Sequence, residues 1–146
     1  MITILLVDDH SYIRKGIRYL LESLGHVEVV ATATNGIEAV AKARLCQPDI
    51  VMMDISMPLM NGIEATRQIR ENCPATRVLA LSIYSDPLYV KNAVQAGATG
   101  YVLKEGLPDE LLEAIESLYN GSPYFSRKIA PFVEHSYLVD NDTGID

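Results

Sequence analysis

The stretch Ile2-Thr3-Ile4-Leu5-Leu6-Val7-Asp8-Asp9 decides the fold, because a nearly continuous apolar run ends abruptly in two carboxylates. A second run of this kind, Ile50-Val51-Met52-Met53-Asp54, also closes on an aspartate. Such short apolar runs are typical of strands that are buried on both faces, as in a parallel sheet covered by helices. We therefore expect two central strands whose carboxyl ends carry acidic side chains.

Segments with the period of a helix alternate with these apolar runs. Leucine and isoleucine recur at helical spacing between Ile13 and Leu24, and Gly25 marks the end of that segment. Asp86 and Pro87 supply an N-cap and a first-turn proline for a later helix. The pattern predicts strands over residues 2–7, 27–31, 50–53, 78–81 and 100–103, each followed by a helix.

Five strand–helix units predict an α/β protein with a doubly wound, five-stranded parallel sheet. Right-handed crossovers give it the flavodoxin-like strand order 2-1-3-4-5, with the less apolar second strand at an edge. Residues 1–120 would form this domain, and residues 121–146 a linker or tail, because periodicity fades after Gly121. Pro131 would interrupt any short helix between Ser126 and Val133.

The composition excludes several classes of protein. With 146 residues, 49% of them apolar, the chain has the length of one domain and enough apolar side chains for a core. Its 12 basic and 19 acidic residues give a net charge of −7, which argues against direct binding to nucleic acid or to an anionic membrane. No apolar run approaches the ~20 residues of a membrane span. Cys46 and Cys73 lack metal-ligand spacing, so we expect a cytoplasmic protein with reduced cysteines.

Polar side chains follow four of the expected strands. They are Asp8 and Asp9 after the first strand, Asp54 after the third, Ser82 after the fourth and Lys104 after the fifth. In an open parallel sheet, ligands bind beyond the carboxyl ends of the strands, near the point where the strand order reverses. The sequence therefore predicts that these side chains share one crevice.

Three carboxylates in one crevice repel one another unless a cation joins them. Mg²⁺ fits such a site, since it prefers oxygen ligands and keeps several waters. Asp9 and Asp54 would be direct ligands, and Asp8 would act through water. The carbonyl of Ser56 would be a further ligand.

The same crevice would accept a phosphoryl group beside the ion. The Lys104 ammonium and the Ser82 hydroxyl would each hold one of its oxygens. Asp54 is the best candidate for a carboxylate nucleophile, because it ends a central strand next to the point of reversal. Aspartyl phosphates are known intermediates, so this site favours phosphorylation of Asp54.

Four motifs occur in order along the chain, with strand–helix spacing between them. They are Val7-Asp8-Asp9-His10, Asp54-x-x-Met57-Pro58-x-x-x-Gly62, Leu81-Ser82 and Gly97-Ala98-x-Gly100-Tyr101-x-x-Lys104. Together they resemble the receiver domain of bacterial response regulators, over roughly residues 2 to 120. The chain is most similar to the NarL/FixJ subfamily, which carries a LuxR-type output domain. The supporting motifs are Asn35-Gly36-x-Glu38-Ala39 and Gly121-x-x-Tyr124-Phe125-Ser126.

The resemblance implies a function in two-component signalling. Asp54 would take a phosphoryl group from a sensor histidine kinase with Mg²⁺ and lose it slowly by hydrolysis, so the domain would not be a turnover enzyme. Ser82 and Tyr101 would form the switch pair, with the hydroxyl moving toward the phosphoryl group and the ring turning inward. This would shift the surface of the fourth helix, fifth strand and fifth helix, and would allow a homodimer.

The resemblance also implies a regulator of transcription. Subfamily members continue into a helix-turn-helix output domain, so DNA contacts would lie outside this chain and the residues after 121 would begin the connection. One departure from the wider family is Glu105, which follows Lys104 where many receivers have a proline.

Other interpretations stay open. A Mg²⁺-dependent phosphatase with an aspartyl nucleophile usually carries a second acid two residues later, where this chain has Ser56. A flavodoxin-like nucleotide or flavin binder would have a glycine- or hydroxyl-rich loop where this chain has Asp8-Asp9-His10. A stand-alone receiver would act by protein–protein contact alone. Tyr101 would serve equally well as an ordinary packing residue.

Overall fold

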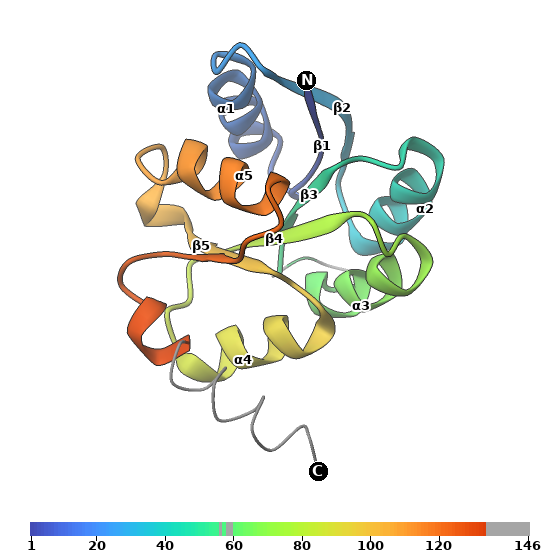
Figure 1. The fold of residues 1–146 in the computed structure, drawn as a ribbon. Helices are drawn as coiled ribbons and strands as arrows, with labels where there is room; N and C mark the ends of the chain where they lie inside the picture. The colour runs from blue at the N-terminus through green and yellow to red at the C-terminus, as the bar shows by residue number, and fades with distance from the viewer. Residues whose placement is uncertain (56, 58–59, 134–146) are drawn as a thin grey trace.

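A six-stranded sheet lies at the centre of the computed structural model, which describes residues 1–55, 57 and 60–133 (Figure 1). Its strands are β1 (Ile2–Val7), β2 (Val27–Ala33), β3 (Ile50–Asp54), β4 (Arg77–Ser82), β5 (Gly100–Leu103) and β6 (Tyr124–Phe125). The helices between them are α1 (Ser11–Glu22), α2 (Gly36–Cys46), α3 (Gly62–Asn72), α4 (Pro87–Ala96) and α5 (Leu111–Tyr119). A short 3-10 turn, Lys104–Gly106, joins β5 to the approach to α5.

The strands are ordered β2-β1-β3-β4-β5-β6, and every neighbouring pair is parallel. The predicted order 2-1-3-4-5 is confirmed, with β2 at one edge. The sheet has one strand more than predicted, because Tyr124 and Phe125 pair with Gly100 and Tyr101 of β5. Two residues are too few to show the alternation by which a strand is recognised in a sequence.

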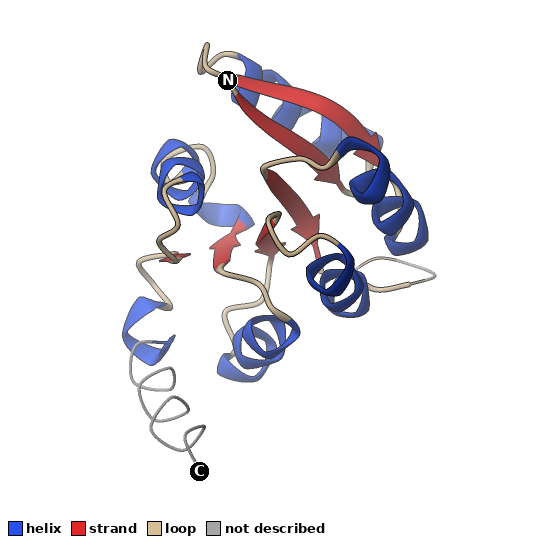
Figure 2. Cartoon of the chain, turned by 45° about the vertical axis from the view of Figure 1, so that its right-hand side comes forward, coloured by secondary structure: helices blue, strands red, loops and turns tan. Residues whose placement is uncertain are grey.

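Two layers of helices cover the sheet. Helices α1 and α5 pack on one face, and α2, α3 and α4 pack on the other (Figures 1 and 2). In β1, Leu5 and Val7 belong to the apolar cluster under α2, α3 and α4, whereas Ile4 and Leu6 belong to the cluster under α1 and α5. Both faces of this strand are therefore buried, which explains why its sequence is apolar almost throughout.

The loop that leads from β4 into α4 is fixed by a helix cap. Asp86 Oδ1 accepts a hydrogen bond from the Leu88 N–H (2.9 Å), and Pro87 occupies the first turn. Gly97 ends the helix with a φ of 115°, a conformation that favours glycine. Asp86 and Pro87 are the capping residues that the sequence predicts.

The chain after α5 folds back along the edge of β5 that does not pair with β4. A helix begins at Ala130, and Pro131 lies in its first turn, where the missing N–H costs no hydrogen bond. The prediction that Pro131 would interrupt this helix is therefore wrong. Within the described ranges, every helix is too short or too polar to span a lipid bilayer.

Candidate functional site

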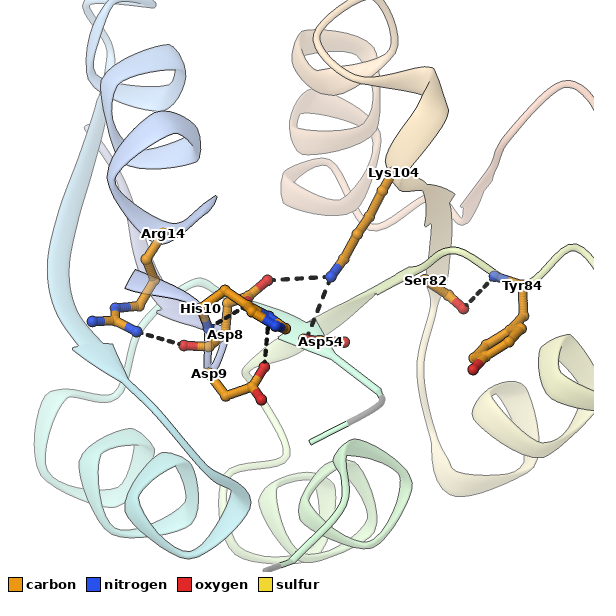
Figure 3. Close-up of polar contacts among 8 residues, drawn as sticks. All are labelled: Asp8, Asp9, His10, Arg14, Asp54, Ser82, Tyr84 and Lys104. Carbon is orange, nitrogen blue, oxygen red and sulfur yellow. Dashed lines mark hydrogen bonds and ion pairs between the residues drawn. The ribbon is translucent and has the colours of Figure 1, made fainter. Parts of the chain in front are cut away.

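The carboxyl edge of the sheet brings three aspartates together. Asp8 and Asp9 follow β1, Asp54 ends β3, and the parallel pairing of these strands places their ends side by side. One oxygen from each carboxylate and a ring nitrogen of His10 all lie within 4.8 Å of one another (Figure 3). The structure thus gathers the carboxylates that the sequence places in one crevice.

Lys104 reaches the same point from the end of β5. Its Nζ lies 3.3 Å from Asp8 Oδ2 and 3.4 Å from Asp54 Oδ2, so one ammonium bridges two carboxylates (Figure 3). Asp8 is fully buried and Asp54 is 2% exposed, and such charges need a partner because burying an unpaired charge is costly. Three carboxylates and one ammonium leave two negative charges, which is the charge that one divalent cation would neutralise.

Hydrogen bonds to the start of α1 hold Asp8 in place. Its Oδ1 accepts a hydrogen bond from the His10 N–H (2.9 Å), and its carbonyl accepts one from Arg14 Nη1 (2.8 Å). The His10 ring lies beside Asp9, with Nδ1 3.0 Å from Asp9 Oδ1. The sequence carries no signal for the part played by Arg14, because a basic residue on an amphipathic helix most often lies on a solvated face.

The donor set fits a hard divalent cation. Its carboxylate oxygens come from Asp8, Asp9 and Asp54, and oxygen is the ligand that Mg²⁺ prefers. A single histidine is too few for an ordinary zinc site. The predicted carbonyl ligand, Ser56, lies outside the described residues.

Ser82 ends β4 and is 1% exposed. Its Oγ accepts a hydrogen bond from the Tyr84 N–H (2.9 Å; Figure 3). The Tyr101 hydroxyl donates one to the Tyr84 carbonyl (2.7 Å). The Tyr84 ring stacks on that of Tyr89, with 4.4 Å between the ring centroids. Tyr84 therefore links the two residues of the predicted switch pair, a role that the sequence does not indicate.

The Tyr101 ring is fully buried, because it belongs to the apolar cluster that also contains Val90 of α4 and Ile129. Burial raises the pKa of the Tyr101 phenol, since the charged phenolate is disfavoured away from water. The structure therefore combines an inward ring with a Ser82 hydroxyl that is bonded to the backbone of Tyr84.

Gly62 lets α3 start close to the end of β3. A Cβ at this position would collide with the backbone of Asp54 and Ile55. Only glycine permits so close an approach, which gives a physical reason for the spacing between Asp54 and Gly62 in the sequence.

The response regulator receiver domain family matches residues 4–116, a range that contains the aspartates, Ser82 and Lys104 of this site. The chain belongs to this family. The receiver domain is similar to two curated regulators: "Transcriptional regulatory protein DegU" of Brevibacillus brevis and "Response regulator UvrY" of Escherichia coli K12. It is 38% identical to DegU and 40% identical to UvrY, over 143 residues in each case.

These alignments cover 97% of this chain and 61% of DegU, and 98% of this chain and 66% of UvrY. The receiver domain thus spans less than two thirds of the length of either relative. Two solved structures share its fold. A LuxR-family two-component response regulator from Aurantimonas sp. SI85-9A1 is 40% identical, with a TM-score of 0.87 over 93% of this chain and 97% of that one. The response regulator domain of Thermotoga maritima CheB is 33% identical, with a TM-score of 0.79 over 84% of this chain and 99% of that one.

Proposed function

We propose that Asp54 is the phosphorylation site of this receiver domain and that a sensor histidine kinase supplies the phosphoryl group. The observation that carries the proposal is the position of Asp54. It ends a central strand, is 2% exposed, and lies 3.4 Å from the Lys104 ammonium. A phosphoryl group on this carboxylate would find a fixed positive charge already beside it.

The proposed transfer is a nucleophilic substitution at phosphorus. A carboxylate oxygen of Asp54 attacks the phosphorus of a phosphohistidine, and the new O–P bond forms as the N–P bond breaks. The electron pair of the broken bond returns to the imidazole of the kinase. Lys104 would neutralise charge on the phosphoryl oxygens, and the Ser82 hydroxyl would turn to donate to one of them. Slow hydrolysis of the acyl phosphate would end the signal, with no turnover of an external substrate.

Asp9 and Asp54 are the proposed direct ligands of Mg²⁺, with Asp8 acting through water and the Ser56 carbonyl as a further ligand. The convergence of the three carboxylates within 4.8 Å supports this assignment. When bound, Mg²⁺ supplies the positive charge that lets an anionic phosphoryl donor approach so many carboxylates.

The proposal extends to the output of the protein. Residues 1–120 would be the receiver and residues 121–146 the start of a linker to a DNA-binding domain. The name of the relative DegU, a transcriptional regulatory protein, supports a function in transcription. Homodimerisation on phosphorylation and a cytoplasmic location stay predictions.

Intact-protein mass spectrometry tests the phosphorylation site. Incubation of the full chain with acetyl phosphate and Mg²⁺ is expected to add one phosphoryl group. Asp54→Asn is expected to abolish the adduct, because an amide cannot form the acyl phosphate. The exposed Asp109→Asn provides a matched control and should be phosphorylated like the wild type.

An adduct of unchanged yield in Asp54→Asn would remove Asp54 as the acceptor. Steady release of phosphate from small phosphomonoesters would instead favour a phosphatase. Either result would contradict the proposal, since both the residue and the single, stoichiometric event are part of it.

A further inference from the structure

Residues 124–133, which we call the docked segment, cover the edge of β5 that a five-stranded sheet would leave open (Figure 1). The first two residues of the docked segment form β6. Ile129 and Val133 are buried in the apolar cluster that also contains Tyr101 and Leu103. The chain itself therefore occupies the strand edge between α4 and α5.

Ser126 is the residue at which the docked segment is tied to β5. Its N–H donates a hydrogen bond to the Tyr101 carbonyl (3.0 Å), and its Oγ accepts one from the Leu103 N–H (2.9 Å). Ser126 is 1% exposed, so both bonds are shielded from water. Its own carbonyl accepts hydrogen bonds from the N–H groups of Ile129 and Ala130, both at 2.9 Å, at the turn that leads into the next helix.

One route from the phosphorylation site reaches Ser126 through Lys104. The Lys104 ammonium lies 3.4 Å from Asp54 Oδ2, and Lys104 follows directly after Leu103 in the chain. The Leu103 N–H is the group that donates to Ser126 Oγ. A shift of Lys104 toward phosphoryl oxygens would therefore pull on the neighbouring residue Leu103, whose N–H makes this bond to Ser126.

A second route reaches Ser126 through the switch pair. Ser82 Oγ is bonded to the Tyr84 N–H, and the Tyr84 carbonyl is bonded to the Tyr101 hydroxyl. The Tyr101 carbonyl then accepts from the Ser126 N–H. Each route thus ends at one hydrogen bond between Ser126 and β5. The route through Lys104 ends at the Leu103 N–H, and the route through the switch pair ends at the Tyr101 carbonyl.

The Tyr124 hydroxyl donates a buried hydrogen bond to Glu110 Oε1 (2.7 Å), which ties the docked segment to the residue before α5 and not to β5. The ion pairs of the docked segment hold it less firmly. The pairs Lys128–Glu105 (3.3 Å) and Arg127–Glu113 (3.8 Å) join side chains that are all more than half exposed. Exposed ion pairs hold little free energy and are screened by salt, so they do not fix one arrangement of the segment.

We propose that Ser126 is a positioning residue that transmits phosphorylation of Asp54 to the docked segment, and through it to the residues beyond 133. The inference rests on the proposed function, because the signal starts with a phosphoryl group on Asp54. Close-packed interiors absorb little displacement locally, so a movement of β5 passes to the groups bonded to it. Coupling between Asp54 and the docked segment is measured by the response of the segment to phosphorylation.

Amide hydrogen exchange on the full chain, with and without acetyl phosphate and Mg²⁺, measures that coupling. In the wild type, phosphorylation is expected to change exchange at Ile129 and Ala130 together with exchange in β5. In Ser126→Ala the Leu103 N–H loses its acceptor, so we expect exchange in the docked segment to be about tenfold faster before phosphorylation. Phosphorylation should then leave it unchanged. Ser122→Ala, at an exposed serine outside the docked segment, should respond like the wild type.

The outcomes separate this inference from the proposed function, because intact mass reports phosphoryl occupancy in the same samples. A fully phosphorylated wild type whose docked segment does not respond overturns the role of Ser126, and so does a Ser126→Ala variant with the full response. A wild type that takes no phosphoryl group overturns the proposed function instead. If Ser126→Ala does not fold, the wild type still tests the inference, because a phosphorylated chain whose docked segment does not respond overturns it. Asp54→Asn is then the unphosphorylated control.

Discussion

At the scale of single residues, the three aspartates of the site differ in which group lies beside their negative charge. Asp8 and Asp54 share the Lys104 ammonium, whereas Asp9, with its side chain 25% exposed, lies against the His10 ring. Without a cation, the carboxylate of Asp9 adds repulsion that the protein must tolerate. Sites that accept such strain for the sake of function are places where a substitution can increase stability.

Asp9→Asn is therefore expected to stabilise the metal-free protein, by about 0.5–1 kcal/mol because water screens a partly exposed charge. Mg²⁺ should raise the melting temperature of the wild type, since a ligand that binds the folded state stabilises it, and should have little effect on Asp9→Asn. Thermal unfolding followed by circular dichroism, in EDTA and in Mg²⁺, measures both effects. Asp109→Asn should respond to Mg²⁺ like the wild type. A wild type that melts at the same temperature in both buffers would contradict the proposed metal site.

At the scale of elements, Tyr124 ties β6 to the residue that precedes α5. Its hydroxyl donates to Glu110 Oε1 at 2.7 Å, and both residues are buried. Burial, together with the hydrogen bond to this carboxylate and its charge, raises the pKa of the Tyr124 phenol far above the ordinary value of 10.0. The neutral phenol is thus part of what holds the extra strand to the fold.

Tyr124→Phe should lower the free energy of unfolding near neutral pH by about 1.5–3 kcal/mol, the usual contribution of a hydrogen bond to a charged group. Because the folded protein holds this proton more tightly, the contribution is complete below pH 10 and is lost as pH rises above it. Urea unfolding at pH 7 and above pH 10 should show the difference between wild type and variant shrinking. Tyr119→Phe, at an exposed ring of α5, should match the wild type at both pH values. A difference that does not change with pH would argue against the bond to Glu110.

The elements that the sequence predicts are those whose burial leaves a pattern in the chain. Strands β1 and β3 are apolar almost throughout because both faces are covered, and their parallel register then brings Asp8 and Asp54 together. Strand β6 leaves no such pattern, since it has two residues and is held by Glu110 and by the edge of β5. The contacts of Arg14 and Ser126 could not be predicted from the sequence either. Their partners include backbone groups, which nearly every residue offers, so the partner leaves no pattern in the chain.

At the scale of the whole molecule, the docked segment decides where the folding unit ends. Helical periodicity ends near residue 120, which is the predicted boundary of the domain. The buried side chains of Ile129 and Val133, however, pack into the same cluster as the core of β3 and β4. A cooperative domain unfolds as one unit, so residues that share its core share its stability.

A chain cut after Gly121 should therefore be less stable than one cut after Val133, by about 2–4 kcal/mol. Each buried aliphatic side chain of the docked segment contributes about 1.5–3 kcal/mol, and the entropy of ordering the segment offsets part of that sum. The shorter chain would also leave the edge of β5 unpaired, which favours association between copies. Urea unfolding of both chains and of the full chain measures the difference, and sedimentation detects association. Equal free energies for the two truncated chains would show that the docked segment adds nothing to the fold and would place the boundary at residue 120.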